Sequence, residues 1–267
     1  MKSIDDNLDS SWESSPNDSG YRKRTYFAER GLSSLFKIFT IPVTPFAQNA
    51  RVLYDSEADS AAIIDPGGDV DRIWSVIDQI QPGQLSIVLT HAHIDHAGGT
   101  ASCLARAAKQ FTAKTHLYAH SDGLLRQTIS QQAMFYGLPE SQYCDAPEPD
   151  VVLGDGDKLA VGSILARSLW TPGHAPDHLS FYFDVKEVEL HEAGQTYAVQ
   201  FPVLIAGDAL FAGSIGRTDL PGGDTRLLLR SIHEKLLTLP ENTVVLPGHG
   251  PPTTIGQEKA TNPYLQE

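Results

Sequence analysis

Three histidines and one aspartate lie close together in this chain, in the segment His91-Ala92-His93-Ile94-Asp95-His96. Neutral imidazole and carboxylate groups are the usual ligands of Zn²⁺ when a coordination position has to stay open for water or substrate. The two-residue spacing of His91 and His93 places both side chains on one side of an extended segment. Asp95 and His96 follow where the chain turns, so they can point at a second, adjacent ion.

The surroundings of this motif argue against a chance arrangement. A single histidine in a loop is usually a polar surface residue, and two histidines with one residue between them are common. Here, however, the motif follows the apolar run Leu85–Thr90 and precedes Gly98-Gly99. A strand that passes into a helix through this loop would let the four side chains converge. The pattern therefore predicts a metal site at the end of a strand.

Three further candidate ligands stand in similar positions later in the chain. His174 occurs in Thr-Pro-Gly-His, Asp208 in Ala-Gly-Asp and His249 in Leu-Pro-Gly-His-Gly. Each follows a short apolar run on a glycine-containing turn, where the backbone can approach an ion closely. We expect them to join the first motif at one edge of a sheet. The role of His178, close to His174, stays open between a ligand and a residue that supports one.

Hydrophobic periodicity predicts the elements that position these residues. Short apolar runs predict strands before the candidate ligands, at Leu85–Thr90, Ser163–Thr171, Val203–Ala206 and Thr243–Leu246. Helical spacing predicts helices at Val70–Ile80, Ala101–Phe111 and, after an Asp224 cap, Leu228–Leu236. Further strands are predicted at Phe36–Val43, Arg51–Asp55, Ala61–Asp65, Thr115–Ala119 and Leu179–Phe183, and a hairpin at Val185–Phe201. Such a mixture predicts sheets packed between helices.

Composition excludes several classes of protein. The chain has 267 residues, of which 41% are hydrophobic and 20% charged, as in ordinary globular proteins. The net charge of −13 argues against nucleic-acid binding, and no apolar run is long enough to cross a membrane. Cys103 and Cys144 form no disulfide framework, and no signal peptide is visible. We therefore expect a cytoplasmic protein with no nucleic-acid or membrane partner; the oligomeric state is not indicated.

The first thirty residues differ from the rest of the chain. Residues 1–30 are rich in Ser, Asp, Asn and Glu and poor in aliphatic residues. Such a segment has little apolar surface to bury, so we expect a disordered polar tail. We expect residues 31–267 to form a single domain, because a chain of this length can bury one full core.

Together these motifs resemble the metallo-β-lactamase superfamily. Within it, the chain from about Pro42 to the C-terminus is most similar to the single-domain type II glyoxalases, the hydroxyacylglutathione hydrolase-like group. The matching segments are Ile64–Asp69, Thr90–Gly99, Pro172–His174, Gly207–Phe211, Gly216–Asp219, Pro247–Gly250, Thr254–Gly256 and Asn262–Tyr264. The metal motifs are specific for the superfamily and less specific for the group.

The resemblance implies an α/β (α+β) protein with the αββα four-layer sandwich of the metallo-β-lactamase fold. It also implies two divalent metal ions at the sheet edge, with Zn expected and Fe or Mn as alternatives. The implied ligands of the first ion are His91, His93 and His174, those of the second are Asp95, His96 and His249, and the implied bridging ligands are Asp208 and a hydroxide.

The implied activity is that of a metal-dependent thioester hydrolase. The metal-bound hydroxide would cleave a small glutathione-derived thioester such as S-lactoylglutathione, with Asp95 and Asp208 as the catalytic residues. Arg217 would bind the substrate, because the matching position in two-domain glyoxalases is a lysine that contacts glutathione. The alternative is that Arg217 pairs with Asp219 or Asp224 and holds its own loop.

Two departures from the family concern the substrate. The chain ends soon after His249, without the C-terminal helical domain with which two-domain glyoxalases bind glutathione. In addition, Asp177 stands where the family commonly has glycine, which would change the turn or the electric field near the site.

Other activities on the same scaffold are kept as alternatives. Persulfide dioxygenases share the His-x-His-x-Asp-His pattern and a Gly-Arg-Thr-Asp segment. They use a single iron, which His91, His174 and Asp208 could hold here as a facial triad. Hydrolysis of another ester or a lactone is a second alternative, and a non-catalytic metal-binding protein is a third.

Overall fold

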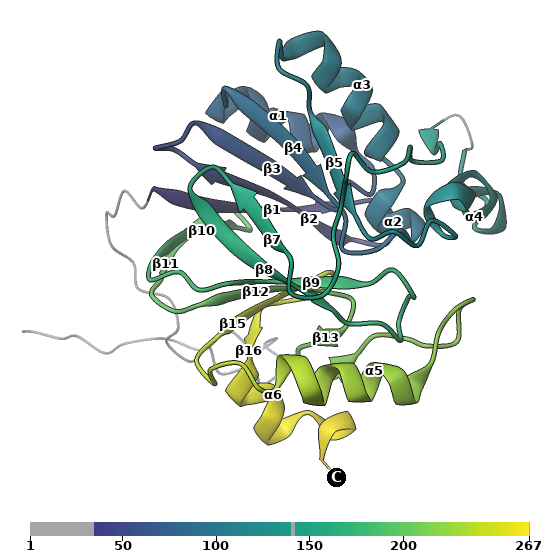
Figure 1. Ribbon diagram of the computed structural model, residues 1–267, viewed down its shortest axis with the longest axis vertical. Coiled ribbons are helices and arrows are strands. Elements are labelled where there is room, and N and C mark those ends of the chain that lie inside the picture. The colour runs from purple at the N-terminus through teal and green to yellow at the C-terminus, as the bar shows by residue number, and fades with distance from the viewer. Residues whose placement is uncertain (1–34, 140–141, 267) are drawn as a thin grey trace, which may run out of the picture.

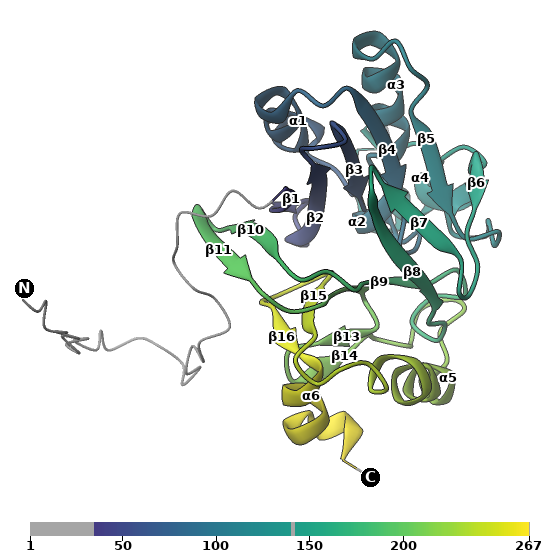
Figure 2. The same ribbon diagram turned by 60° about the vertical axis from the view of Figure 1, so that its left-hand side comes forward.

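Two β-sheets lie face to face, with helices on both outer faces. The computed structural model describes residues 35–139 and 142–266; the tail expected at residues 1–30 lies outside the described residues. Helices α1 (Val70–Ile80) and α3 (Thr100–Gln110) cover the first sheet, and α5 (Thr225–Ser231) and α6 (Ile255–Thr261) cover the second (Figures 1 and 2). This arrangement confirms the αββα four-layer sandwich.

The first sheet has eight strands in the order β11-β10-β1-β2-β3-β4-β5-β6. Strands β1 to β3 form an antiparallel meander. Strands β3 to β6 run parallel, and helical segments connect each of them to the next. The bounds are β1 (Phe36–Val43), β2 (Gln48–Asp55), β3 (Ser60–Ile64), β4 (Gln84–Val88), β5 (His116–Ala119), β6 (Val151–Val152), β10 (Val188–Glu192) and β11 (Gln195–Val199). The predicted hairpin is β10–β11, which extends this sheet beside β1.

The second sheet has six strands in the order β16-β15-β12-β9-β8-β7, and a small hairpin, β13–β14, lies outside it. Only β12 and β15 are parallel within it. The bounds are β7 (Lys158–Val161), β8 (Ile164–Trp170), β9 (Leu179–Phe183), β12 (Val203–Gly207), β13 (Leu210–Phe211), β14 (Ser214–Ile215), β15 (Val244–Pro247) and β16 (Thr253–Thr254).

The helices form where the sequence places apolar residues on one face. In α1, Ile73, Trp74 and Ile77 are buried against the first sheet, and each such side chain contributes roughly 1.5–3 kcal/mol when it leaves water. Asp224 caps α5, as predicted, by accepting a hydrogen bond from the N–H of Leu227 (2.9 Å). The remaining helical segments are α2 (Ile94–Ala97), η1 (Arg126–Thr128), α4 (Ile129–Phe135), the π-helical turn η3 (Ile232–Leu236) and η4 (Pro263–Leu265).

The two sheets are joined at the edge where β4, β8, β12 and β15 end. The N–H of Leu179 donates to the carbonyl of Thr90 (2.7 Å), and the N–H of Asn49 donates to the carbonyl of Gly248 (2.7 Å). The buried guanidinium of Arg51 donates to the carbonyl of Pro247 (2.8 Å). Because these bonds connect one sheet to the other, the loops that follow the strand ends have fixed relative positions.

Within residues 35–139 and 142–266, no helix is both long and apolar enough to cross a membrane.

Candidate metal centre

The loop after β4 carries four of the predicted ligands. We expected Asp95 and His96 to lie in a loop, but the structure places them on the one-turn helix α2, which corrects that expectation. The carbonyl of His93 accepts hydrogen bonds from the N–H groups of His96 (3.0 Å) and Ala97 (2.9 Å). A single turn is too short to show hydrophobic periodicity, so the sequence pattern could not indicate it.

The first ligand group consists of His91, His93 and His174, all buried. The Nε2 atom of His174 lies 2.9 Å from Nδ1 of His93 and 3.2 Å from Nε2 of His91. His174 follows β8 in the second sheet, while His91 and His93 follow β4 in the first. Three imidazole nitrogens from two sheets therefore converge on one point.

The second ligand group consists of Asp95, His96 and His249. Nε2 of His249 lies 3.1 Å from Oδ2 of Asp95, and Nε2 of His96 lies 3.9 Å from the same oxygen. The side chains of His249 and Asp95 are 29% and 18% exposed, whereas that of His96 is fully buried. Solvent and small molecules therefore reach the centre from the side of this second group.

Asp208 lies between the two groups. Its Oδ2 atom is 3.6 Å from Nε2 of His174, in the first group, and 3.6 Å from Nε2 of His249, in the second. Its Oδ1 atom is 3.2 Å from Nε2 of His96. The structure thus brings together all seven residues that the sequence suggested as ligands, with Asp208 in the place expected of a bridging ligand.

The hydrogen bonds of the rings leave nitrogen atoms free at the centre. Four rings donate from Nδ1 to an oxygen of the protein: His91 to Thr90 Oγ1 (3.0 Å), His96 to Asp65 Oδ2 (2.9 Å), His174 to the carbonyl of Arg217 (2.8 Å) and His249 to the carbonyl of Phe46 (3.2 Å). A ring that donates from Nδ1 presents the lone pair of Nε2 when it is neutral. Several lone pairs that face one another favour a cation between them.

Unsatisfied buried atoms support the same conclusion. Nε2 of His96 and Oδ1 of Asp208 are buried and lie 3.2 Å apart, but neither makes a hydrogen bond of good geometry, which is costly unless another group satisfies them. A Cβ atom at Gly248 would lie 2.0 Å from that Asp208 oxygen and 2.7 Å from the His96 ring, so only glycine leaves the space open. The donor set and the space fit a metal ion, and this His/Asp cluster is a metal-binding site.

Burial keeps the first group in the form that binds metal. Burial and the neighbouring histidines lower the pKa of His91 well below its usual value. Burial and the nearby His174 lower the pKa of His93 to about 3, and burial also lowers the pKa of His174. These rings are therefore neutral at pH 7, and a neutral imidazole is the form that ligates a metal.

The carboxylates keep the centre negative. Burial would raise the pKa of Asp208, but the surrounding histidines, His96 first, hold it far below its usual value. The pKa of Asp95 is also lowered, because His96 and His249 outweigh the effect of burial. Burial opposes protonation of His96, yet Asp208 and Asp95 raise its pKa well above the usual value. A cation between these carboxylates would take the place of the proton on His96.

The sequence comparisons identify the family. The model of the metallo-β-lactamase superfamily matches residues 43–188 and 193–249, more than half of the chain. The chain belongs to the metallo-β-lactamase superfamily. A similar relative is the hydroxyacylglutathione hydrolase GloC of Haemophilus influenzae, with 36% identity over 84% of this chain and 96% of GloC.

Two solved structures resemble the chain over most of its length. The BLEG-1 B3 metallo-β-lactamase has 37% identity and a TM-score of 0.69, and the match covers 86% of this chain and all of BLEG-1. The protein TTHA1623, solved in a di-iron-bound form, has 32% identity and a TM-score of 0.67, with 85% of this chain and all of TTHA1623 covered.

Asp65 is not a ligand but holds Thr90 and the ligand His96 in place through hydrogen bonds. Its carboxylate accepts hydrogen bonds from the N–H (2.7 Å) and hydroxyl (2.6 Å) of Thr90 and from Nδ1 of His96 (2.9 Å). The residue has a positive φ of 52°, which is uncommon for a residue with a side chain. In the sequence, Asp65 stands out only as part of the motif Ile64–Asp69, and its position at the end of a predicted strand is the signal for this role.

His178 supports Asp208 and lies outside the two ligand groups. Its Nε2 atom accepts a hydrogen bond from the N–H of Asp208 (3.0 Å), so Nδ1 carries the proton and donates to Thr171 Oγ1 (2.8 Å). The Thr171 hydroxyl contacts Ser180 (2.9 Å), which donates to the carbonyl of Ala206 (3.1 Å). Of the two roles that the sequence left open, these contacts favour the supporting one.

Arg217 forms the ion pair that the sequence analysis gave as its alternative role. Its guanidinium donates two hydrogen bonds to the carboxylate of Asp219 (2.7 Å each), and both side chains are exposed. Asp224 caps α5 instead. An exposed pair of this kind stabilises the fold little. Only the backbone carbonyl of Arg217 contacts the centre, where it accepts a hydrogen bond from His174 (2.8 Å). Binding of substrate by Arg217 stays a prediction.

Four other histidines lie outside the two ligand groups. His191 stacks on Phe39 and bonds to Glu189, and His120 stacks on Trp170. His233 and His116 are exposed. Cys103 is buried and Cys144 is exposed.

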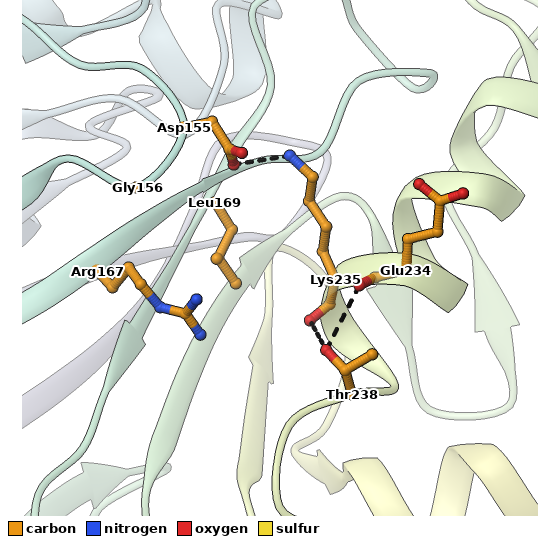
Figure 3. A pocket seen from close by; sticks show the side chains of 7 residues that line it. All are labelled: Asp155, Gly156, Arg167, Leu169, Glu234, Lys235 and Thr238. Carbon is orange, nitrogen blue, oxygen red and sulfur yellow. Dashed lines mark hydrogen bonds and ion pairs between the residues drawn. The ribbon is translucent and has the colours of Figure 1, made fainter.

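A second, small cleft lies away from the metal centre. It is formed by Asp155, Gly156, Arg167, Leu169, Glu234, Lys235 and Thr238 (Figure 3). Lys235 points to Asp155 and bonds to it (2.7 Å). None of the residues that line this cleft belongs to the ligand groups, so the cleft gives no indication of the superfamily chemistry.

The buried carboxyl group of Asp177 gives a prediction about pH. Its side chain is buried, Oδ1 has no hydrogen-bond partner, and burial raises its pKa to about 7. Because the folded pKa exceeds the ordinary value of 3.8, the contribution of Asp177 to stability is present below about pH 4 and lost as the pH rises to about 7. Between pH 5 and pH 8, the free energy of unfolding of the metal-free protein should fall by about 3 kcal/mol relative to Asp177→Asn.

Urea unfolding of both proteins at the two pH values would measure this difference. Asp184→Asn, which removes an exposed carboxylate, is the matched control and should show no comparable dependence on pH. A constant difference between the parent and Asp177→Asn from pH 5 to pH 8 would contradict the prediction.

Proposed function

We propose that this member of the superfamily, a metal-dependent hydrolase, uses two metal ions to cleave a thioester of the S-lactoylglutathione type. The observation that carries the proposal is the pair of ligand groups that share one carboxylate. His91, His93 and His174 form one group, Asp95, His96 and His249 form the other, and Asp208 lies between them.

The chemistry follows from what the two groups hold. Two divalent ions bound there would supply a hydroxide at neutral pH, because they lower the pKa of bound water. Asp208 keeps a negative charge between the groups, where it offsets the charges of the ions. Asp95 faces solvent and can accept a hydrogen bond from the attacking water, which orients it. A thiolate is a good leaving group, so no side chain has to act as general acid.

The relatives support the choice of substrate. GloC of Haemophilus influenzae is described as a hydroxyacylglutathione hydrolase, and its match covers most of both chains. We carry that substrate class to this protein as part of the proposal. We also propose Zn as the metal, with Fe or Mn as alternatives, since TTHA1623 was solved with two irons.

Persulfide oxygenation on a single iron is the second candidate. His91, His174 and Asp208 also lie together, with Nε2 of His174 3.2 Å from His91 and 3.6 Å from Asp208. That reaction would leave the second group, Asp95 and His249 above all, without a role. For this reason the proposal favours hydrolysis.

A substrate panel tests the proposal. Metal-loaded protein should hydrolyse S-lactoylglutathione with kcat/KM above roughly 10⁴ M⁻¹s⁻¹, the lower end of the usual range for enzymes. It should act at least about ten-fold less well on lactones and β-lactams, which lack a thiolate leaving group, and should consume no O₂ with glutathione persulfide. Consumption of O₂ without thioester hydrolysis would establish the dioxygenase alternative instead.

A further inference from the structure

Exposed apolar side chains gather beside the metal centre. Phe46, Met134, Phe135 and Tyr136 are 37%, 65%, 79% and 38% exposed. The Tyr136 ring makes edge contacts with Phe46 (centroids 5.4 Å apart) and with Phe135 (5.0 Å). We call Phe46, Phe135 and Tyr136 the aromatic rim. Single exposed apolar residues are ordinary, but a contiguous group of them marks a binding surface.

Two contacts attach the aromatic rim to the centre. The carbonyl of Phe46 accepts the hydrogen bond from Nδ1 of His249 (3.2 Å). Helix α4, whose last residue is Phe135, lies beside α2 (Figure 1). Gln132 of α4 accepts from the N–H of Ile94 (2.9 Å) and donates to the carbonyl of Ala92 (3.2 Å). The rim therefore borders the solvent-facing side of the centre.

The loop that carries Arg217 borders the centre beside the first ligand group. The carbonyl of Arg217 accepts from Nδ1 of His174 (2.8 Å), whereas the carbonyl of Phe46 accepts from Nδ1 of His249 in the second group. The guanidinium of Arg217 is paired with Asp219. A molecule at the centre would thus contact the aromatic rim beside the second group.

Polarity decides which end of a thioester fits the rim. Residues 127–139 contain no charged side chain, in a chain with 33 acidic residues. A glutathione group carries two carboxylates and an ammonium group, and these would lose water without gaining a partner against the uncharged rim. The acyl group would then lie against Phe46, Phe135 and Tyr136. A lactoyl group is too small and polar to cover three rings.

We propose that the aromatic rim is an acyl-binding subsite, and that the substrate is a thioester whose acyl group is aromatic or similarly apolar. The inference rests on the proposed function and makes its substrate class narrower. Contact of an aromatic acyl group with the rim should raise kcat/KM by at least about ten-fold over a substrate without that contact. This is the effect of modest apolar contacts in enzyme pockets.

The test compares S-phenylacetylglutathione with S-lactoylglutathione. We expect kcat/KM to favour the phenylacetyl thioester by at least about ten-fold. Phe135→Ser, a change at a largely exposed side chain, and Tyr136→Ser should each bring the ratio of the two kcat/KM values toward one. Leu165→Ser is the matched control, since Leu165 is 52% exposed on β8, away from α4. It should leave the ratio as in the parent.

Binding of two thioethers, S-benzylglutathione and S-methylglutathione, separates this inference from the proposed function. The benzyl compound should bind the metal-loaded parent at least about ten-fold more tightly, and Phe135→Ser should remove the difference. If no thioester is hydrolysed but this preference is found, the proposed function is wrong and the subsite stands. If both thioethers bind equally or not at all, or if the kcat/KM ratio is the same in Phe135→Ser as in the parent, the acyl subsite is wrong.

Discussion

Replacement of Asp208 by asparagine should lower thioester hydrolysis by at least about two orders of magnitude, since changes one layer further from the metal already cost 10–100-fold. The amide keeps the shape of the side chain and removes its charge. The two ligand groups would then lack the anion that lies 3.6 Å from both His174 and His249. Bound ions would repel each other more, and the acidity of bound water would fall.

Steady-state hydrolysis and elemental analysis of the same preparations would measure both effects. Asp208→Ala should reduce the content of both ions together, because the residue lies between the groups. His233→Ala, at an exposed residue of η3, is the matched control and should keep the activity of the parent. If Asp208→Asn retained its metal and hydrolysed S-lactoylglutathione at the parental rate, the bridging role of Asp208 would be wrong.

Removal of the metal should abolish hydrolysis and lower the melting temperature. Ions that bind only the folded state stabilise it by about 4 kcal/mol at a thousand-fold excess over Kd, which corresponds to roughly 10 °C for a chain of this size. The buried atoms Nε2 of His96 and Oδ1 of Asp208, which make no hydrogen bond of good geometry, are the physical reason, because a cation would satisfy both. Calorimetry before and after chelation would measure the shift.

Elemental analysis gives the companion result. Protein saturated with Zn, Fe or Mn should hold about two ions per chain, and readdition of metal after chelation should restore both activity and melting temperature. Saturation at one ion with each metal in turn would contradict the two-ion assignment and favour the single-iron alternative. A chain that melts at the same temperature with and without chelator would show that the cluster needs no ion.

The ligand set could be predicted from the sequence because each ligand is locally marked. His174, Asp208 and His249 each follow an apolar strand and stand next to a glycine. His91 begins a motif with four possible metal ligands in six residues. Strand ends meet at a sheet edge in this class of fold, so local patterns were enough to predict that the four segments converge. The layers of the fold followed similarly from runs of apolar residues.

The supporting contacts could not be predicted, because they join residues that are distant in sequence. Asp65 bonds to Thr90 and His96, and His178 bonds to the backbone of Asp208. Periodicity reports only which face of an element is buried, whereas such bonds depend on positions within a few tenths of an ångström. The structure therefore decided that His178 supports Asp208 and lies outside the ligand groups.

The surroundings of the centre were also decided by tertiary structure. The carbonyls of Phe46 and Arg217 orient His249 and His174, and a backbone carbonyl has no signature in a sequence. Arg217 looked equally suited to substrate and to a neighbouring carboxylate, and only the fold of its loop places Asp219 at 2.7 Å. The sequence by itself determined which side chains could hold metal, since ligand chemistry belongs to residue types. The structure determined how those side chains are oriented and what borders them, since both depend on contacts between distant segments.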